Sequence, residues 1–286
     1  MITKAVVPAA GRGTRLLPAT RSQPKEMLPV GRKPTIQHVV EELAQSGLRE
    51  VLLISGQGKR SIEDHLDRDA CPNDEPHQPW MDLRFFHARQ SQPRGLADAI
   101  AIAEPFAGGQ PFAVALGDSI ILSRHHEHVL RRMIKVHEQR RPAATIAVEE
   151  VPHEAVSRYG IVAPKGKIGN IFPIRGFVEK PSPSAAPSNL AAAGRYVLEP
   201  AIFDAIRRTK PGIGGELWLT DALGLLLKEG HEIICVRLRR DEHRLDIGNF
   251  LSYYQAFIEL SLADPEHAPA LRSWLRKRLR QRKSPR

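Results

Sequence analysis

A short apolar segment that runs directly into a glycine-rich turn lies at the start of this chain. Residues 5–7 are Ala-Val-Val, which predicts a buried first strand, and residues 8–15 follow as Pro-Ala-Ala-Gly-Arg-Gly-Thr-Arg. Glycine permits positive backbone φ angles and leaves no side chain between a ligand and the backbone. With the nearby cations Arg15 and Lys25, the N–H groups of such a turn can hold phosphates; a plain tight turn is the alternative. The spacing matches neither the G-x-G-x-x-G dinucleotide pattern nor the G-x-x-x-x-G-K-[ST] P-loop.

Apolar strands and amphipathic helices alternate over the first half of the chain. Residues 35–46 repeat apolar side chains at helical spacing, with Glu41, Glu42 and Gln45 expected on the outer face. Residues 51–54 are a continuous Val-Leu-Leu-Ile run, typical of a strand buried on both faces. The other expected strands are 83–86, 112–116 and 143–148, and the other expected helices are 59–66, 95–103 and 128–139. This order predicts an α/β fold with a mostly parallel sheet, in which ligands gather beyond the carboxyl ends of the strands.

The second half of the chain has shorter strands and denser turns. We expect strands at 160–162, 168–172, 177–178, 195–197 and 233–238, and helices at 201–207, 222–229 and 249–262. This pattern predicts a small β-rich substrate subregion attached to one α/β domain, which spans residues 1–265. Residues 266–286 are expected to form a basic C-terminal helix and tail. A proline-rich stretch at 67–79 is expected to be a surface loop.

The formal charge of +10 admits nucleic acid, a membrane surface or an anionic small substrate as a partner. Much of the excess lies near the C-terminus, in Arg272, Arg276, Lys277, Arg278, Arg280, Arg282, Lys283 and Arg286. Apolar side chains are interspersed with these cations, so the segment predicts an amphipathic helix with a solvated basic face, followed by disordered last residues. Because no DNA- or RNA-binding motif accompanies the tail, we do not expect nucleic acid to be the partner.

Cysteine usage and hydropathy favour a cytoplasmic protein. Cys71 and Cys235 lie far apart and fit neither a disulfide framework nor a zinc site. His125, His126 and His128 lack the context of a metal motif and are expected to be solvated. The N-terminus has no signal-peptide pattern, and no apolar run is long enough to cross a bilayer. We therefore expect no membrane partner.

Two aspartates that follow predicted strands are candidate Mg²⁺ ligands. Asp118 comes directly after the strand at 112–116, and Asp246 lies between a short apolar segment and the helix at 249–262. Mg²⁺ takes one or two carboxylates together with phosphate oxygens and water. Either aspartate could instead cap a turn or a helix. The sequence alone permits a metal site without requiring one.

Glu179, Lys180 and Pro181 follow another short predicted strand. Pro181 should restrict Lys180 to an extended backbone and so hold its ammonium group in a defined direction. A cation directed into a crevice suits a phosphate, and a neighbouring carboxylate suits sugar hydroxyls. An ordinary surface ion pair is the alternative.

Several short motifs along the chain together indicate a family resemblance. They are Pro-Ala-Ala-Gly-x-Gly-Thr-Arg at 8–15, Pro-Lys-Glu-Met-Leu-Pro at 24–29, Lys-Arg-Ser-Ile-Glu-Asp-His at 59–65, Arg-Tyr-Gly-Ile-Val at 158–162, Val-Glu-Lys-Pro at 178–181, Pro-Ser-Asn-Leu at 187–190, Gly-Arg-Tyr-Val-Leu at 194–198, Glu-Leu-x-Leu-Thr-Asp-Ala at 216–222 and Asp-Ile-Gly-Asn at 246–249. On these motifs the chain resembles the bacterial sugar-1-phosphate nucleotidyltransferases, most closely the UTP–glucose-1-phosphate uridylyltransferases. The motifs at 24–29 and 59–65 are the narrower ones and point to the uridylyl branch.

The resemblance implies a doubly wound, Rossmann-like fold and the Mg²⁺-dependent reaction UTP + glucose 1-phosphate → UDP-glucose + pyrophosphate. It implies that Arg15 and Lys25 bind the triphosphate and the departing pyrophosphate. It also implies that Asp118 and Asp246 bind the Mg²⁺ ion and that Lys180 binds the sugar phosphate. Glu179 and the backbone of Gly160 are implied to bind the glucose hydroxyls. The nucleotide-binding positions that it implies are Ala10, Gly11, Gly13, Thr14, Glu26, Gln90 and Gly95, and Ala10, Gly11, Gln90 and Gly95 fall where the family recognises the nucleobase.

Three segments depart from the uridylyl pattern. Residues 116–119 are Leu-Gly-Asp-Ser where uridylyl enzymes usually have Leu-Pro-Asp, and residues 90–97 are more similar to the thymidylyl branch. The loop at 67–79 is shorter than the usual segment of the family. A glucose-1-phosphate thymidylyltransferase that uses dTTP is therefore an alternative, and a non-catalytic sugar-nucleotide-binding regulatory protein is another. The family commonly assembles through its C-terminal helices, which implies a homodimer or homotetramer. The apolar residues Leu271, Leu275 and Leu279 would suit such an interface or packing within the chain.

Overall fold

A computed structural model of the chain describes residues 1–67, 77–123, 125 and 127–281. Some predictions fall outside these residues. They concern most of the expected surface loop at 67–79, Cys71, His126 and the tail cations Arg282, Lys283 and Arg286.

Four parallel strands form the N-terminal part of the central sheet. β1 (Lys4–Pro8) lies between β4 (Glu50–Ser55) and β6 (Phe112–Ala115), and β5 (Arg84–Arg89) lies beyond β4. β1, β4 and β6 are almost entirely buried, in keeping with their runs of small and apolar residues. Because β1 and β6 are parallel neighbours, the glycine turn after β1 and the turn after β6 meet at one edge of the sheet.

The sheet becomes mixed where β11 (Leu190–Leu198) joins it. β11 is antiparallel to β6 and to β8 (Ala144–Glu150), and β8 is parallel to β12 (Ile233–Arg237). β10 (Ile171–Glu179) pairs antiparallel with β12 and with β9 (Gly160–Pro164), and β9 also pairs with β11, so that β11, β8, β12, β10 and β9 form a closed ring.

The α/β class is confirmed, but the prediction of a mostly parallel sheet is wrong for this second part. The dense turns are the physical reason, since antiparallel strands can be joined by a tight turn whereas parallel strands need a long crossover. The two short strands expected at 168–172 and 177–178 are one strand, β10, with an irregularity between Ile174 and Gly176.

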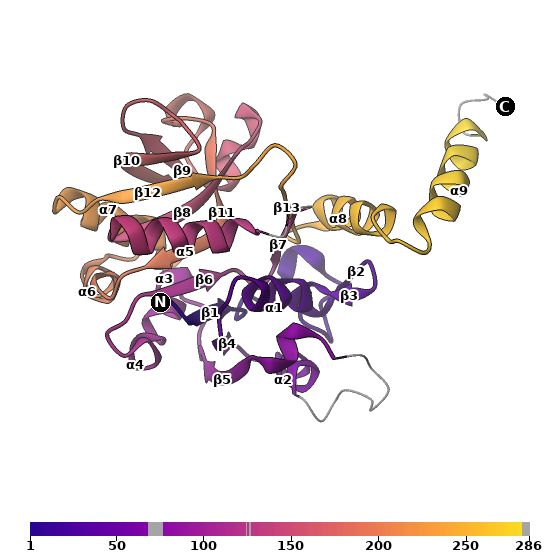
Figure 1. The fold of residues 1–286 in the computed structure, drawn as a ribbon, viewed down its shortest axis with the longest axis horizontal. Coiled ribbons are helices and arrows are strands. Elements are labelled where there is room, and N and C mark those ends of the chain that lie inside the picture. Colours follow the sequence, from indigo (N-terminus) through magenta and orange to yellow (C-terminus); the bar gives the residue numbers. More distant parts are fainter. Residues whose placement is uncertain (68–76, 124, 126, 282–286) are drawn as a thin grey trace.

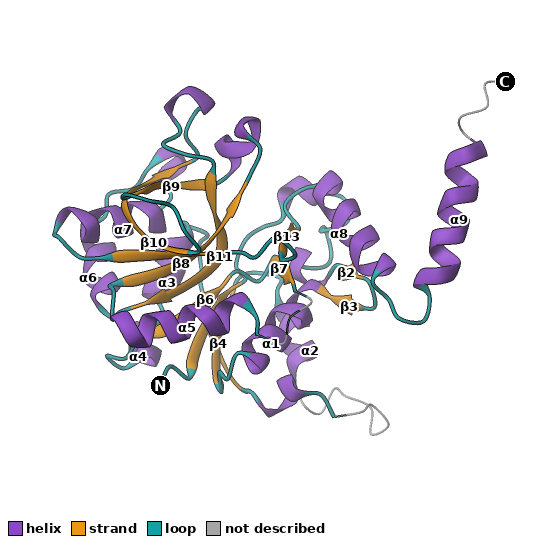
Figure 2. Cartoon of the chain, turned by 45° about the horizontal axis from the view of Figure 1, so that its top comes forward, coloured by secondary structure: helices purple, strands orange, loops and turns teal. Residues whose placement is uncertain are grey.

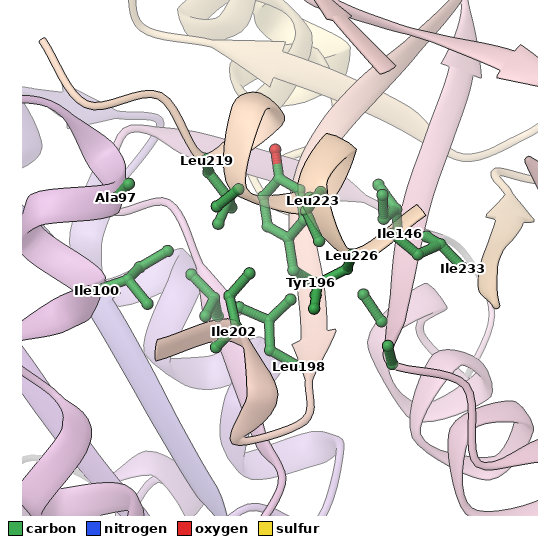
Figure 3. Close-up of a cluster of buried hydrophobic side chains, with 14 of the residues drawn as sticks. Ala97, Ile100, Ile146, Tyr196, Leu198, Ile202, Leu219, Leu223, Leu226 and Ile233 are labelled. Carbon is green, nitrogen blue, oxygen red and sulfur yellow. The ribbon is translucent and has the colours of Figure 1, made fainter. Parts of the chain in front are cut away.

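Helices cover both faces of the sheet (Figure 1). α3 (Leu96–Ala101), α6 (Ala201–Arg208) and α7 (Leu219–Lys228) contribute to one apolar cluster, which Figure 3 shows around Tyr196. The other cluster draws on α1 (Thr35–Gln45), α2 (Arg60–Leu66) and α5 (Val129–Arg140). Adjacent residues of β1, Val6 and Val7, belong to opposite clusters, as a strand buried on both faces requires.

One residue of α1 contradicts the helical pattern. Glu42, expected on the outer face, is 4% exposed and forms a buried ion pair with Arg195 of β11. The apolar spacing correctly located the helix, but the partner on a distant strand is visible only in the folded chain.

Two short strands outside the main sheet were not expected from the sequence. β7 (Ser119–Leu122) and β13 (His243–Asp246) form an antiparallel ladder. The remaining elements are β2 (Pro29–Val30), β3 (Lys33–Pro34), α4 (Glu104–Ala107), α8 (Phe250–Leu262), α9 (Ala268–Gln281) and 3₁₀ turns at Thr14–Leu16, Lys25–Met27, Pro79–Asp82, His153–Arg158, Pro183–Ala185 and Ile213–Gly215.

The C-terminal helices extend away from the sheet. α8 packs on the β7–β13 region, and α9 projects beyond it (Figure 2). The expected boundary between residues 1–265 and 266–286 stays a prediction. No helix within the described ranges is long and apolar enough to span a membrane.

Candidate active site

A cleft of about 990 Å³ lies at the edge of the sheet where the turns after β1 and β6 meet. Its lining also includes the start of β9, the end of β10, the start of α7, parts of β11 and β13, and residues 91–94 and 96. Of the residues expected at the site, the cleft gathers Gly11, Gly13, Thr14, Arg15, Lys25, Asp118, Gly160, Glu179, Lys180 and Asp246. Ala10, Glu26, Gln90 and Gly95 are not among its lining residues.

Lys25 packs against the glycine turn. Gly13 has φ 66° and begins a 3₁₀ turn, and the hydroxyl of Thr20 donates to its carbonyl oxygen at 2.8 Å. A Cβ atom at Gly11 would lie 3.5 Å from Nζ of Lys25. The ammonium group of Lys25 thus lies against the turn at ordinary van der Waals distance, and Nζ donates to Oδ2 of Asp118.

The β7–β13 ladder brings the two aspartates together. Asp246 is paired in register with Ser119, and the backbone N–H of Ile247 donates to the carbonyl oxygen of Asp118 at 3.0 Å. Asp246 does not cap the following helix, because Asn249 does: its Oδ1 accepts from the N–H of Ser252 at 3.1 Å. Both aspartates are therefore held at the cleft by backbone pairing.

The charges of this cluster are strongly coupled. Burial works against charge on Lys25, but Asp118 and Glu26 raise its pKa to about 12. Burial would raise the pKa of Asp118, but the ion pair with Lys25 brings that pKa below its ordinary value. Burial and then the neighbouring charge of Asp118 raise the pKa of Asp246. Arg244, Lys25 and Arg158 act in the opposite direction and favour the charged form of Asp246.

The donor set fits Mg²⁺ only with help from a ligand. The described part of the chain contains no group of three or more His, Cys, Asp or Glu side chains arranged to hold a metal. Two carboxylates beside a phosphate-sized space nevertheless match the ordinary coordination of Mg²⁺, which combines one or two carboxylates with phosphate oxygens and water.

Gly248 leaves the space that the Asp246 carboxylate occupies. A Cβ atom at Gly248 would lie 2.6 Å from Oδ2 of Asp246, which is far inside van der Waals contact. Gly248→Ala should therefore displace the carboxylate while leaving the backbone in place. For the nucleotidyl transfer that the family resemblance implies, we expect kcat to fall by about tenfold to a hundredfold, since small misplacements at a reacting centre have such effects. The melting temperature should change little, and unchanged kcat would contradict this role of Gly248.

Glu179 and Lys180 lie in the cleft as an ion pair, with Lys180 Nζ 3.1 Å from Glu179 Oε1. The expectation that Pro181 keeps Lys180 extended is wrong, because Lys180 has φ 42°. Its N–H donates to the carbonyl oxygen of Tyr159 at 3.0 Å, which fixes this turn at the end of β10. A non-glycine residue in this conformation carries strain of the kind that often marks functional sites.

Gly160 lies where three elements approach closely. A Cβ atom there would lie 2.8 Å from Cε2 of Phe177 on β10 and 2.9 Å from Cγ2 of Thr220 on α7. The residue must therefore be small, and its backbone lines the cleft beside Glu179.

Three of the expected nucleotide-binding residues have other contacts in the structure. Gln90 is 5% exposed, and its Nε2 donates to Asp98 Oδ2 at 2.7 Å and to the carbonyl oxygen of Gly95 at 3.2 Å. Gly95 has φ 103°, and a Cβ atom there would lie 2.4 Å from the carbonyl oxygen of Leu217. Glu26 is 1% exposed and paired with Lys59.

The structure adds residues to the cleft that received no role from the sequence, among them Arg94, Arg158, Tyr159, Trp218 and Arg244. The guanidinium of Arg244 lies 4.1 Å from the ring centroid of Tyr159, and its Nε donates to Glu149 Oε1 at 2.5 Å. Arg158 and Arg244 each precede a predicted site residue by two positions. Their closeness to these motifs is the feature of the sequence by which the two arginines could have been predicted at the site.

Comparison with known proteins defines the class to which this fold and cleft belong. The family model described as nucleotidyl transferase matches residues 4–261, and the chain belongs to that family. Within it, the chain is 42% identical over 286 residues to the UTP–glucose-1-phosphate uridylyltransferase YngB of Bacillus subtilis, a match that covers 96% of this chain and 94% of that protein.

Solved structures agree with the sequence comparison. A UDP-glucose pyrophosphorylase complexed with UDP-glucose superposes with a TM-score of 0.84 and 36% identity, covering 92% of this chain and 100% of the other. A UTP-bound UGPase from Acinetobacter baumannii gives a TM-score of 0.84 and 32% identity, covering 96% of this chain and 99% of the other. The resemblance to the uridylyl branch is thereby confirmed.

Proposed function

We propose that this chain transfers a uridylyl group from UTP to glucose 1-phosphate and releases pyrophosphate. The observation that carries the proposal is that one cleft gathers the glycine turn, the Lys25–Asp118–Asp246 cluster and the Glu179–Lys180 pair. These groups can bind two phosphorylated substrates side by side. The names of the relatives described above supply the identities of both substrates.

The reaction that these groups support is an in-line displacement. A phosphate oxygen of glucose 1-phosphate attacks the α-phosphorus of UTP, the bond from the α-phosphorus to the oxygen that bridges to the β-phosphorus breaks, and pyrophosphate leaves with that oxygen. Such a transfer depends mainly on positioning and on neutralisation of charge. Arg15 and Lys25 bind the triphosphate and stabilise the leaving pyrophosphate, while Lys180 holds the phosphate of the sugar.

Lys25 must exchange partners when UTP binds. In the structure its ammonium group is paired with Asp118, the residue that we propose as a Mg²⁺ ligand with Asp246. Entry of a triphosphate allows Lys25 to bind phosphate oxygens and frees Asp118 for the metal. Mg²⁺, when bound, neutralises the charge of the reacting phosphates.

The remaining contacts determine which sugar and which base bind. We propose that Glu179 and the backbone of Gly160 bind glucose hydroxyls. On the nucleotide side, Gly13 and Thr14 supply the turn and Gly11 contacts the base. Ala10, Gln90 and Gly95 do not line the cleft in this structure, so they would reach the base only after a local rearrangement. The amide of Gln90 offers both a donor and an acceptor to a pyrimidine edge, and it would have to exchange its present contacts with Gly95 and Asp98 to do so.

The test of the proposal is pyrophosphate release by the purified protein with Mg²⁺ and glucose 1-phosphate, comparing UTP with dTTP. We expect faster release with UTP. Uracil and thymine differ by one methyl group, a difference that hydrophobic discrimination converts into only about 1–3 kcal/mol. Faster release with dTTP would move the chain to the thymidylyl branch, and release with neither nucleotide would reject the proposed reaction.

We also propose that the chain forms a homodimer or homotetramer through its C-terminal helices. Large apolar side chains are exposed there, including Leu251, Tyr254 and Ile258 on α8 and Trp274 and Leu279 on α9. Exposed apolar groups in such number favour a protein contact. Light scattering that gives the mass of one chain at micromolar concentration would reject this assembly.

A further inference from the structure

A buried ion pair joins the two motifs that mark the uridylyl branch. Glu26 belongs to the motif at 24–29 and Lys59 to the motif at 59–65, 33 residues apart. Nζ of Lys59 donates to Oε2 of Glu26 at 2.6 Å, and the two side chains are only 5% and 1% exposed. Neither residue lines the cleft, so this pair contacts neither the proposed nucleotide site nor the proposed sugar site directly.

The pair is nevertheless connected to the cleft through Lys25. Glu26 directly follows Lys25 in the 3₁₀ turn Lys25–Met27, whose N–H groups bond back to residues 24 and 25. Charges therefore alternate from Lys59 through Glu26 and Lys25 to Asp118. A change in charge at the buried end of this series acts on the cation that we place at the triphosphate.

The segment that carries Lys59 is also tied to the glycine turn. The hydroxyl of Ser55 donates to Oε1 of Glu63 at 2.8 Å, which fixes the end of β4 to α2. Gly56 lies so close to Ala10 that a Cβ atom would be 3.0 Å from the carbonyl oxygen of that residue. Lys59 is thus held in a fixed position relative to the turn against which Lys25 packs.

Electrostatics explain why Glu26 needs a partner of its own. Burial raises the pKa of this carboxyl, while first Lys59 and then Lys25 stabilise its charged form. A buried carboxylate without a partner is strongly unfavourable. Without the charge of Lys59, Lys25 still favours ionised Glu26, and Glu26 would then compete with the phosphates for it.

We infer that the Glu26–Lys59 pair positions Lys25 and keeps its ammonium group available for the triphosphate of the nucleotide. Lys59 is therefore a positioning residue for UTP binding. Glu26, expected from the family resemblance at the nucleotide, acts through the backbone turn that it shares with Lys25. This inference rests on the proposed function, because it concerns the same nucleotide site.

The test is Lys59→Met, with UTP binding measured by calorimetry and initial rates measured against each substrate separately. We expect the dissociation constant of UTP to rise by about tenfold or more, because Lys25 is diverted to Glu26. KM for glucose 1-phosphate should stay within about twofold of the wild-type value. The matched control is Arg60→Met, which removes the same charge from the next residue but from a side chain that is 89% exposed. It should leave UTP binding within about twofold of wild type.

A double variant separates positioning from simple stabilisation. Lys59→Met with Glu26→Gln removes both charges at similar side-chain volume, so residue 26 no longer carries a carboxylate that competes with the phosphates for Lys25. We expect its UTP dissociation constant to return to within about threefold of wild type. Thermal unfolding of all variants shows whether each is folded under the conditions of the binding measurement.

The outcomes distinguish this inference from the proposed function. If the Lys59→Met variant melts at a lower temperature but binds UTP as tightly as wild type, the pair has a purely structural role and the inference is overturned. A double variant as impaired as the single variant would overturn it as well. Wild-type protein that binds UTP but releases no pyrophosphate would instead overturn the proposed reaction, while the binding data would still decide the role of Lys59.

Discussion

Asp118→Asn is expected to lower kcat for pyrophosphate release by about a thousandfold, the scale of losing one preorganised electrostatic group at a reacting centre. The substitution keeps the shape of the side chain and removes its charge. The variant lacks the carboxylate that pairs with Lys25 in the structure and that we propose as a metal ligand. The backbone contact from Ile247 to the carbonyl oxygen of residue 118 persists, so the turn should keep its conformation.

Ser119→Ala is the matched control for this prediction. Ser119 is the next residue, is 3% exposed, and its Oγ has no hydrogen-bond partner among the described residues. Removing the hydroxyl should change kcat by no more than about threefold. Equally small effects of both substitutions would reject Asp118 as a metal ligand, and equally large effects would indicate damage to the turn rather than loss of a charge.

Arg195→Met is expected to lower the free energy of unfolding by about 3–5 kcal/mol, the range for breaking a buried ion pair on one side. The side chain of Arg195 is fully buried, and its Nη2 donates to Glu42 Oε2 and to the carbonyl oxygen of Ser119, both at 2.8 Å. Methionine leaves the carboxylate of Glu42, which is 4% exposed, without a cation. Urea unfolding of wild type and variant measures the difference.

Two further variants test the cause of this effect. Arg207→Met breaks an exposed pair with Glu104, in which the side chains are 57% and 48% exposed, and should cost no more than about 1 kcal/mol. Combining Arg195→Met with Glu42→Met removes both buried charges and should recover much of the lost stability. Equal losses for Arg195→Met and Arg207→Met would contradict a special role of the buried pair.

The parts of the fold that the sequence predicted correctly are those governed by local patterns. β1, β4 and β6 were located because a strand buried on both faces must be apolar throughout. α1 and α5 were located because their apolar residues repeat at the period of the helix. The ladder of β7 and β13 was missed because each strand has only four residues and its partner lies more than a hundred residues away in the chain.

The candidate site shows the same division. The glycine turn, Lys25, Asp118, Asp246 and the Glu179–Lys180 pair were all chosen from the sequence, and the structure gathers them in one cleft. The conformation of Lys180 was predicted incorrectly, because its hydrogen bond to Tyr159 determines the backbone more strongly than the following proline does.

The sequence by itself determined the main buried strands and amphipathic helices, the family and the chemistry of the residues at the strand ends, because residue type and short-range spacing express all of these directly. Only the tertiary structure decided which charges become partners. Lys25 and Asp118 are 93 residues apart, and Glu42 and Arg195 are 153 apart. Pairing over such separations depends on how strands are ordered in the sheet and on which side chains burial removes from water. No local sequence pattern specifies which charged residues will pair.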